Sequence, residues 1–199
     1  FGIADSVDLD TLRWQRGGYR IDDLDRVYTG NDARAGLVLN KVNEYVLAPG
    51  RMRALGFCVS VAHAQFMARF CTEHGLNSLA LSAESTDQER RTAQDRLRRR
   101  EINALFVVDL YNEGVDIPEV DTVLFLRPTE SLTVFLQQLG RGLRLHRDKD
   151  CLTVLDFIGA QRREFRYAPR FRAISGEPAA RVDREIEAGF PHLPPPAPP

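Results

Sequence analysis

The feature that most limits how this chain can fold is an alternation of short apolar runs with helical patterns between residues 51 and 172. The apolar runs predict five strands, over residues 55–61, 78–81, 104–108, 122–126 and 152–157. Strands that are apolar throughout and are joined by helices are typical of a parallel sheet covered on both faces. The sequence therefore predicts an α/β domain of three layers, with a mainly parallel central sheet flanked by helices.

Helical patterns and their boundary signals lie between and before these runs. Thr86 and Glu89 form a capping-box pattern, which is typical of a helix start, and Gly75 is placed to end the preceding helix. Ser131 is a candidate N-cap for the last of these helices. The predicted helices cover residues 31–47, 62–74, 86–100 and 131–139.

Two flanking segments differ from this alternating zone. Residues 1–50 mix acidic and apolar residues without a strand-like run, and they are predicted to be a partly helical connecting segment. Residues 175–199 end in a proline-rich run, which is typical of an extended tail or linker. The compact domain is therefore expected to span residues 51–174.

Composition excludes several functional classes. The 199 residues carry a formal net charge of -1, so a nucleic-acid-binding surface can only be a local patch. No apolar run approaches the ~18 residues of a membrane span, and no membrane partner is expected. The widely spaced Cys58, Cys71 and Cys151 fit neither a disulfide framework nor a metal site, which favours reduced thiols in a cytoplasmic protein. No metal site is predicted, and His63 and His74 are interpreted as surface or cap residues.

Polar residues with a possible chemical role follow the third predicted strand. Glu113 and Asp116 flank Gly114 in a loop that Pro118 ends. A glycine admits a ligand close to the backbone, and an acid at such a position can accept hydrogen bonds from a ribose. Composition alone favours a simple capped turn over a nucleotide contact here.

A second group lies on the helix predicted after the fourth strand. Arg141 and Arg144 are three residues apart, so they share one helix face, and Gly140 leaves room beside them. Two guanidinium groups on one face can neutralise the charge that develops during phosphoryl transfer. A solvated basic face explains the pair equally well. For the arginines between residues 90 and 100, a solvated face with internal ion pairs is favoured over a phosphate contact.

These segments together resemble three motifs of superfamily 2 helicases. Gln137-x-x-Gly140-Arg141-x-x-Arg144 resembles motif VI, residues 112–120 resemble motif V, and residues 56–64 resemble motif IV. The motifs stand in the family's order, and the resemblance covers about residues 51–172. It implies the C-terminal RecA-like lobe of a DEAD/DEAH-like helicase, most similar to the bacterial restriction and defence type.

The resemblance also implies roles for single residues on the nucleotide side of the lobe. Arg144 matches the arginine finger that reaches the γ-phosphate of ATP, and Arg141 matches its neighbour, which faces the phosphates or an acid of the first lobe. Gln137 and Gly140 belong to the same motif, which Gln137 orients. Gly114 and Asp116 match the motif that couples the nucleotide to the strand-binding surface, with Asp116 near the ribose.

On the nucleic-acid side, the resemblance places Ser60 and Ser82, at the ends of the first two predicted strands, near the nucleic-acid backbone. Val108 stands where DEAD-box proteins have a threonine before the motif V acid, so one hydroxyl contact of the RNA-binding type is lost. This departure weakens the case for strand binding of the DEAD-box type, and the resemblance to the restriction type favours DNA over RNA as the partner.

The sequence lacks the other half of an ATPase site. It contains neither a GxxxxGK[ST] phosphate loop nor a DExx box. The resemblance therefore implies that ATP with Mg²⁺ is held mainly by the N-terminal RecA-like lobe of the same parent chain. Because phosphoryl transfer needs groups from both sides, we expect the isolated fragment not to hydrolyse ATP.

Two other classes of function remain open at this point. The chain is also consistent with a non-hydrolytic nucleic-acid-binding or regulatory module that keeps the helicase lobe fold. A phosphate loop encoded upstream would favour the motor over this module. A dinucleotide-binding enzyme would need a GxGxxG after a strand, and the sequence has none.

Overall fold

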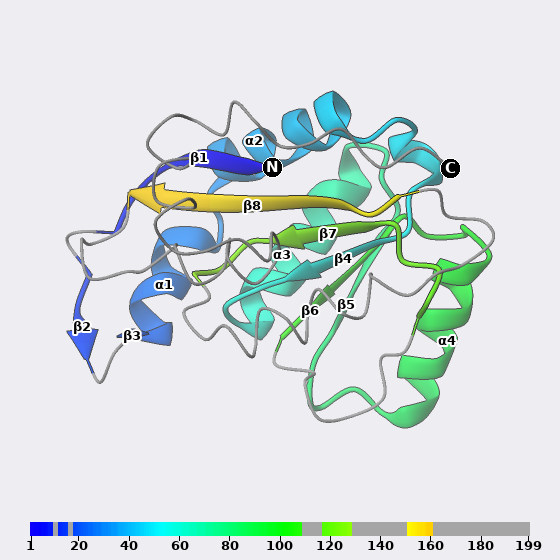
Figure 1. Ribbon diagram of the computed structural model, residues 1–199. Helices are drawn as coiled ribbons and strands as arrows, with labels where there is room; N and C mark the ends of the chain where they lie inside the picture. Colours follow the sequence, from blue (N-terminus) through cyan, green and yellow to red (C-terminus); the bar gives the residue numbers. More distant parts are fainter. Residues whose placement is uncertain (10–11, 16–17, 109–116, 129–150, 161–199) are drawn as a thin grey trace, which may run out of the picture.

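A six-stranded parallel sheet forms the centre of the molecule (Figure 1). The computed structural model describes residues 1–9, 12–15, 18–108, 117–128 and 151–160. Within them the sheet strands are β1 (Gly2–Asp8), β4 (Ala54–Phe57), β5 (Ser78–Leu81), β6 (Ala104–Val107), β7 (Thr122–Phe125) and β8 (Thr153–Ala160). Their order is β1-β8-β7-β4-β6-β5. The predicted mainly parallel sheet is confirmed.

Helices cover this sheet and join its strands. They are α1 (Ile21–Tyr28), α2 (Asp32–Tyr45), α3 (Val61–Glu73) and α4 (Asp87–Arg98), with a 3-10 turn at Pro49–Arg51. The start and stop signals in the sequence explain these bounds. Asn31 caps α2, Gly75 follows α3 with a φ of 87°, and Thr86 and Glu89 form the predicted capping box of α4.

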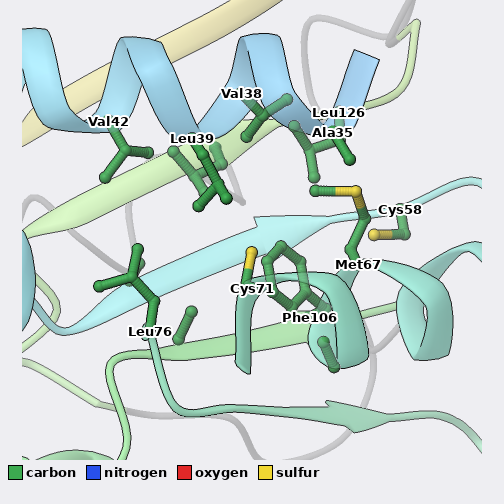
Figure 2. Packing of buried hydrophobic residues seen from close by; sticks show 14 of the residues in the cluster. Ala35, Val38, Leu39, Val42, Cys58, Met67, Cys71, Leu76, Phe106 and Leu126 are labelled. Atoms are coloured by element: carbon green, nitrogen blue, oxygen red, sulfur yellow. The ribbon is translucent and has the colours of Figure 1, made fainter. Parts of the chain in front are cut away.

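The strands alternate their side chains between two cores, one on each face of the sheet. Leu55 and Phe57 of β4 face α4, whereas Leu124 of β7 faces α2 and α3. Figure 2 shows the second of these cores. The side chains of α2 and α3 that the figure labels are Ala35, Val38, Leu39, Val42, Met67 and Cys71. This arrangement gives the three layers that the sequence predicts.

One glycine is required by the close packing of this core. Gly56 pairs with Phe106 on the neighbouring strand β6. A Cβ atom at position 56 would lie 2.5 Å from Cδ1 of the Phe106 ring, which is much closer than carbon atoms pack. The absence of a side chain at Gly56 therefore leaves the space that the buried Phe106 ring occupies beside β4.

The first 50 residues differ from their prediction. The sequence predicts no strand there, and this is wrong, because β1 pairs in parallel with β8 at the edge of the main sheet. A short antiparallel pair also forms, between β2 (Trp14–Gln15) and β3 (Gly18–Tyr19), and α1 follows it. The predicted helix of residues 31–47 is confirmed as α2, which packs against β1, β8 and α3. Much of this segment is thus part of the folded unit.

Candidate functional site

The carboxyl ends of the central strands lie at one level of the sheet. Phe57 of β4 pairs with Val107 of β6 and with Phe125 of β7, and Val107 pairs in turn with Leu81 of β5. The residues that follow each strand therefore gather along one edge, which we call the carboxyl edge. In open parallel sheets, ligands bind outside this edge.

Ser60 lies at the carboxyl edge, between β4 and α3. It caps α3, because its hydroxyl oxygen accepts a hydrogen bond from the backbone N–H of His63 at 3.0 Å. The same hydroxyl donates a hydrogen bond to the carboxylate of Asp25 on α1. The oxygen is thus half-buried and already engaged with an acid of the N-terminal segment.

Ser82 follows β5 at the same edge, but its environment is more enclosed. The residue is 8% exposed, and its hydroxyl donates a hydrogen bond to the Glu84 carboxylate. This bond holds the pKa of Glu84 below its usual range. A phosphate could contact the Ser82 hydroxyl only after Glu84 moved aside. The structure thus brings Ser60 and Ser82 to one edge and gives each hydroxyl a carboxylate partner.

Sequence reasoning missed a buried charged cluster at this edge, centred on Arg34 of α2. The Arg34 side chain is 1% exposed, and its Nε donates a hydrogen bond to Oδ2 of Asp5 on β1 at 2.5 Å. Its Nη2 donates to the backbone carbonyl of Leu126, directly after β7, at 3.0 Å. Its guanidinium carbon lies 3.9 Å from the centre of the Tyr28 ring. Arg34 therefore joins β1, α1, α2 and β7.

His63, in the first turn of α3, completes the cluster and is not the surface residue that the sequence predicts. It is fully buried and stacks on Tyr28, with ring centres 5.5 Å apart. Its Nδ1 lies 3.4 Å from the Val59 backbone nitrogen and its Nε2 lies 3.5 Å from Nη1 of Arg34. A neutral imidazole has one lone pair, so it can accept from only one of these donors. Burial and the Arg34 charge lower the pKa of His63 to about 3 and keep the ring neutral.

A weak sequence signal for this cluster exists in hindsight. Arg34, Val38 and Val42 follow one another at intervals of four residues, so Arg34 continues the buried face of α2. Asp5 gives no such signal, because an acid beside small and polar residues is typical of an exposed position.

Six predicted site residues lie outside the residues that the structure describes. They are Gly114 and Asp116, in the loop after β6, and Gln137, Gly140, Arg141 and Arg144, in the segment after β7. Their contacts stay predictions. Both segments begin at the carboxyl edge, because Val107 and Phe125 are the last residues of their strands there.

The arginine-rich helix α4 mainly carries local ion pairs. Arg98 pairs with Asp95 at 2.9 Å and with Glu119 at 3.5 Å, and Arg96 pairs with Glu101 at 3.6 Å. The predicted solvated face with ion pairs is confirmed for these two arginines. Arg90 differs, because it is buried and donates a hydrogen bond to the Ala83 carbonyl at 2.8 Å.

The remaining candidate ligands do not gather. Cys58 and Cys71 are buried free thiols and Cys151 is exposed, and burial raises the pKa of Cys71 to about 12. His74 is exposed at the end of α3, as the sequence predicts. Across the described ranges, no three His, Cys, Asp or Glu side chains are grouped to hold a metal ion. No helix in those ranges is long and apolar enough to cross a membrane.

The fold and its carboxyl edge define a RecA-like lobe of the kind found in helicases. One solved structure, domain 2 of the DEAD-box helicase Mss116p bound to an RNA duplex, matches with a TM-score of 0.55 and 17% identity. The match covers 81% of this chain and 65% of that one. At this identity the likeness shows the fold alone, and it confirms the predicted RecA-like α/β architecture.

Sequence comparison then gives the family. The model of the helicase conserved C-terminal domain matches residues 38–146, more than half of the chain, so the chain belongs to this family. The ATP-dependent helicase IRC3 of Saccharomyces cerevisiae is 31% identical over 131 residues, which are 66% of this chain and 19% of IRC3. The endonuclease subunit of the type I restriction enzyme EcoKI from Escherichia coli is 30% identical over 54% of this chain and 10% of that protein.

These matches confirm a C-terminal lobe of superfamily 2 helicases. The chain spans about a fifth of the length of IRC3 and a tenth of the EcoKI subunit. The family match begins at Val38, inside α2, so β1, α1 and the first turn of α2 precede it. Arg34 and Asp5 therefore lie ahead of the segment that carries the family match.

Proposed function

We propose that this chain is the second motor lobe of an ATP-dependent nucleic-acid helicase or translocase. In this proposal Arg141 and Arg144 act as arginine fingers, and the carboxyl edge forms part of the strand-binding surface. The observation that carries the proposal is the family match over residues 38–146, because it includes Gln137, Gly140 and both arginines of the predicted motif VI.

The geometry of the described residues supports this assignment. Motif V begins five residues after Val107, and the segment with both arginines follows Phe125, so the two segments leave the ends of the two strands that flank β4. A partner lobe that presents ATP with Mg²⁺ to this edge would meet both segments at once. Two guanidinium groups brought to the γ-phosphate would stabilise the charge of the transition state, and loss of that phosphate would let the lobes separate.

The carboxyl edge also supplies candidate contacts for a nucleic-acid strand. Ser60 and the N-terminus of α3 offer a hydroxyl and backbone N–H groups, which are common partners of phosphate oxygens. Asp25 holds the Ser60 hydroxyl, and Glu84 holds that of Ser82, so each contact requires an acid to be displaced. DNA is the favoured substrate, because the EcoKI relative is a restriction endonuclease subunit and Val108 replaces the threonine of DEAD-box proteins.

The experiment that tests the motor function measures ATP hydrolysis by this fragment alone and mixed with the segment encoded upstream, with and without single-stranded DNA. We expect no turnover from the fragment and DNA-stimulated turnover from the mixture. In the full-length protein, Arg144→Ala is expected to abolish stimulated hydrolysis while ATP binding is retained. Turnover at the wild-type rate in that variant would show that Arg144 is not the finger.

A non-hydrolytic binding or regulatory module is the second candidate. It predicts that the full-length protein binds nucleic acid with no ATP turnover, whatever stands at position 144. A full-length protein that binds single-stranded DNA without hydrolysing ATP would therefore favour this module over the motor.

A further inference from the structure

We propose that Arg34 is a positioning residue of the motor, which fixes the carboxyl end of β7 and with it the origin of the segment that bears Arg141 and Arg144. This inference rests on the proposed function and goes beyond it. Arg34 is not one of the predicted motif residues, and it precedes the family match at residue 38.

The first argument is the shape of the contact. The two arms of one planar guanidinium reach different elements, since Nε bonds to Asp5 of β1 and Nη2 bonds to the Leu126 carbonyl. A rigid fork of this kind fixes a distance and an angle between its partners, which a flexible point charge does not. The end of β7 is therefore held in place relative to the N-terminal segment of the chain.

The second argument is the position of Leu126. It follows the last residue of β7, and Arg141 and Arg144 stand only 15 and 18 residues further along the chain. Sheet hydrogen bonding also continues to this point, because the Leu126 N–H donates to the Phe57 carbonyl at 3.1 Å. The Leu126 peptide is thus held by β4 on one side and by Arg34 on the other.

The third argument is that a buried ion pair costs desolvation free energy here, although apolar side chains could fill the same space without that cost. The side chains of Arg34 and Asp5 are 1% and 0% exposed, and a buried ion pair often stabilises a protein no more than apolar residues of the same size would. The pair lies at the edge where ligands bind, next to His63 and the Ser60 cap. A role in geometry explains a charged group at this place better than a role in stability.

The test uses the full-length protein and the conservative variant Arg34→Lys. Lysine keeps the charge beside Asp5, but it cannot form the fork that also holds the Leu126 carbonyl. We expect kcat of DNA-stimulated ATP hydrolysis to fall about 10- to 100-fold, since a displacement of ~1 Å has effects of this size. The KM for ATP and the Kd for single-stranded DNA should change less than about threefold.

A second buried arginine supplies a matched control. Arg53, at the opposite end of the sheet, has a side-chain exposure of 2% and pairs with Asp121. Arg53→Lys should lower Tm in the same way as Arg34→Lys and leave kcat within about twofold of the wild type. All rates are compared at a temperature well below each variant's Tm.

A double-mutant cycle separates positioning from simple damage to the fold. The background is Arg144→Lys, which keeps the charge and a measurable rate. If Arg34 acts through the arginine fingers, the loss of rate in the Arg34→Lys/Arg144→Lys double variant should be clearly smaller than the two single losses combined. Wild-type kcat in Arg34→Lys, equal losses of kcat in Arg34→Lys and Arg53→Lys, or fully additive losses of Arg34→Lys and Arg144→Lys would each overturn the positioning role alone. A wild-type protein without DNA-stimulated hydrolysis would overturn the motor function, and the positioning role with it.

Discussion

Arg53 and Arg34 are buried at opposite ends of the central sheet, but their side chains make different kinds of contact. At the amino end, Arg53 pairs with Asp121 across neighbouring strands, where the backbone of the same two residues also pairs. At the carboxyl end, Arg34 reaches from α2 to β1 and to the end of β7. The first arginine reinforces contacts that the sheet already makes, whereas the second holds together elements that no ladder joins.

The surroundings of the two arginines sharpen this difference. Asp121 keeps 23% of its side chain exposed, so water still reaches the Arg53 pair. Asp5 is fully enclosed, and the neighbours of Arg34 are an aromatic ring and a neutral histidine. A strongly desolvated cluster therefore lies at the end of the sheet where function is expected, and a partly solvated pair lies at the other end.

The largest expected effect is on the free energy of unfolding of Arg34→Met. The change leaves the Asp5 carboxylate buried without its partner, which typically costs about 3–5 kcal/mol. Arg53→Met should cost less, about 1–3 kcal/mol, because Asp121 can be hydrated. Urea unfolding of both variants measures the difference. Equal losses would show that the two ends are energetically alike.

The next largest expected loss of stability comes from a substitution between the two ends of the sheet, at Gly56. Gly56→Ala forces the new Cβ against the Phe106 ring, and overpacking of this kind costs about 1–3 kcal/mol. Gly36→Ala on α2, where a Cβ would meet nothing within 4 Å, is the matched control and should not destabilise the protein. Thermal unfolding of the two variants is the measurement, and a stable Gly56→Ala protein would contradict the packing around Phe106.

The free energy of unfolding is expected to depend on pH because of His63, at the carboxyl end of the sheet. Its pKa is 6.5 when the chain is unfolded and about 3 when folded, so only the unfolded chain gains a proton as pH falls below 6.5. Stability should therefore decrease on acidification, approaching about 1.4 kcal/mol per pH unit. The charged and titratable groups that face the ring are Arg34, Tyr28 and Asp25.

Between pH 6.5 and pH 5 this histidine titrates above the range of the carboxylates. The hydrogen bond from Arg13 lowers the pKa of Asp23 to about 2. The stability that this carboxylate adds to the folded state is therefore lost only below pH 3.8. Denaturant unfolding of His63→Phe should show a much flatter dependence on pH in that window, while the exposed His74→Gln should behave as the wild type. An unchanged pH dependence in His63→Phe would mean that the buried ring is not the source.

The smallest effects are expected from one polar contact at each end. Thr86→Ala removes the cap of α4 near the carboxyl edge, and Asn103→Ala removes a 2.8 Å hydrogen bond to the Gly50 carbonyl at the amino end. Each should cost about 1 kcal/mol. Chemical unfolding at pH 7 measures both losses of stability. Similar losses in the two variants would show that the two ends of the sheet differ in their buried arginines and not in these polar contacts.

Much of the fold could be predicted because its strands are apolar and its helices carry clear caps. The β5 bounds agree with the prediction, and β4 is shorter than predicted because Ser60 already caps α3. The strand that was missed, β1, mixes Ile3 with acids, and the charge of its buried Asp5 is compensated by Arg34 of α2. A pairing that depends on a residue 29 positions away leaves no local pattern in the sequence.

The candidate site was predictable only in part, for a related reason. Motif spacing identifies Ser60 and Ser82 as edge residues, since each follows a strand. It says nothing of the carboxylates that hold their hydroxyls, because Asp25 approaches Ser60 from a helix 35 residues earlier. His63 was misjudged for the same cause, since the aromatic ring and the arginine that enclose it come from α1 and α2.

The pairing of β1 with β8 sets the order in which the lobe can be completed during synthesis. Ile3 pairs with Phe157, so more than 150 residues leave the ribosome between one partner and the other. Contacts so distant in sequence form late, because a long loop must close first. Until then Asp5 has only part of its final environment, and α1 and α2 emerge before the strand that joins their segment to the sheet. The part of the lobe that is translated first is therefore among the last to reach its native pairing.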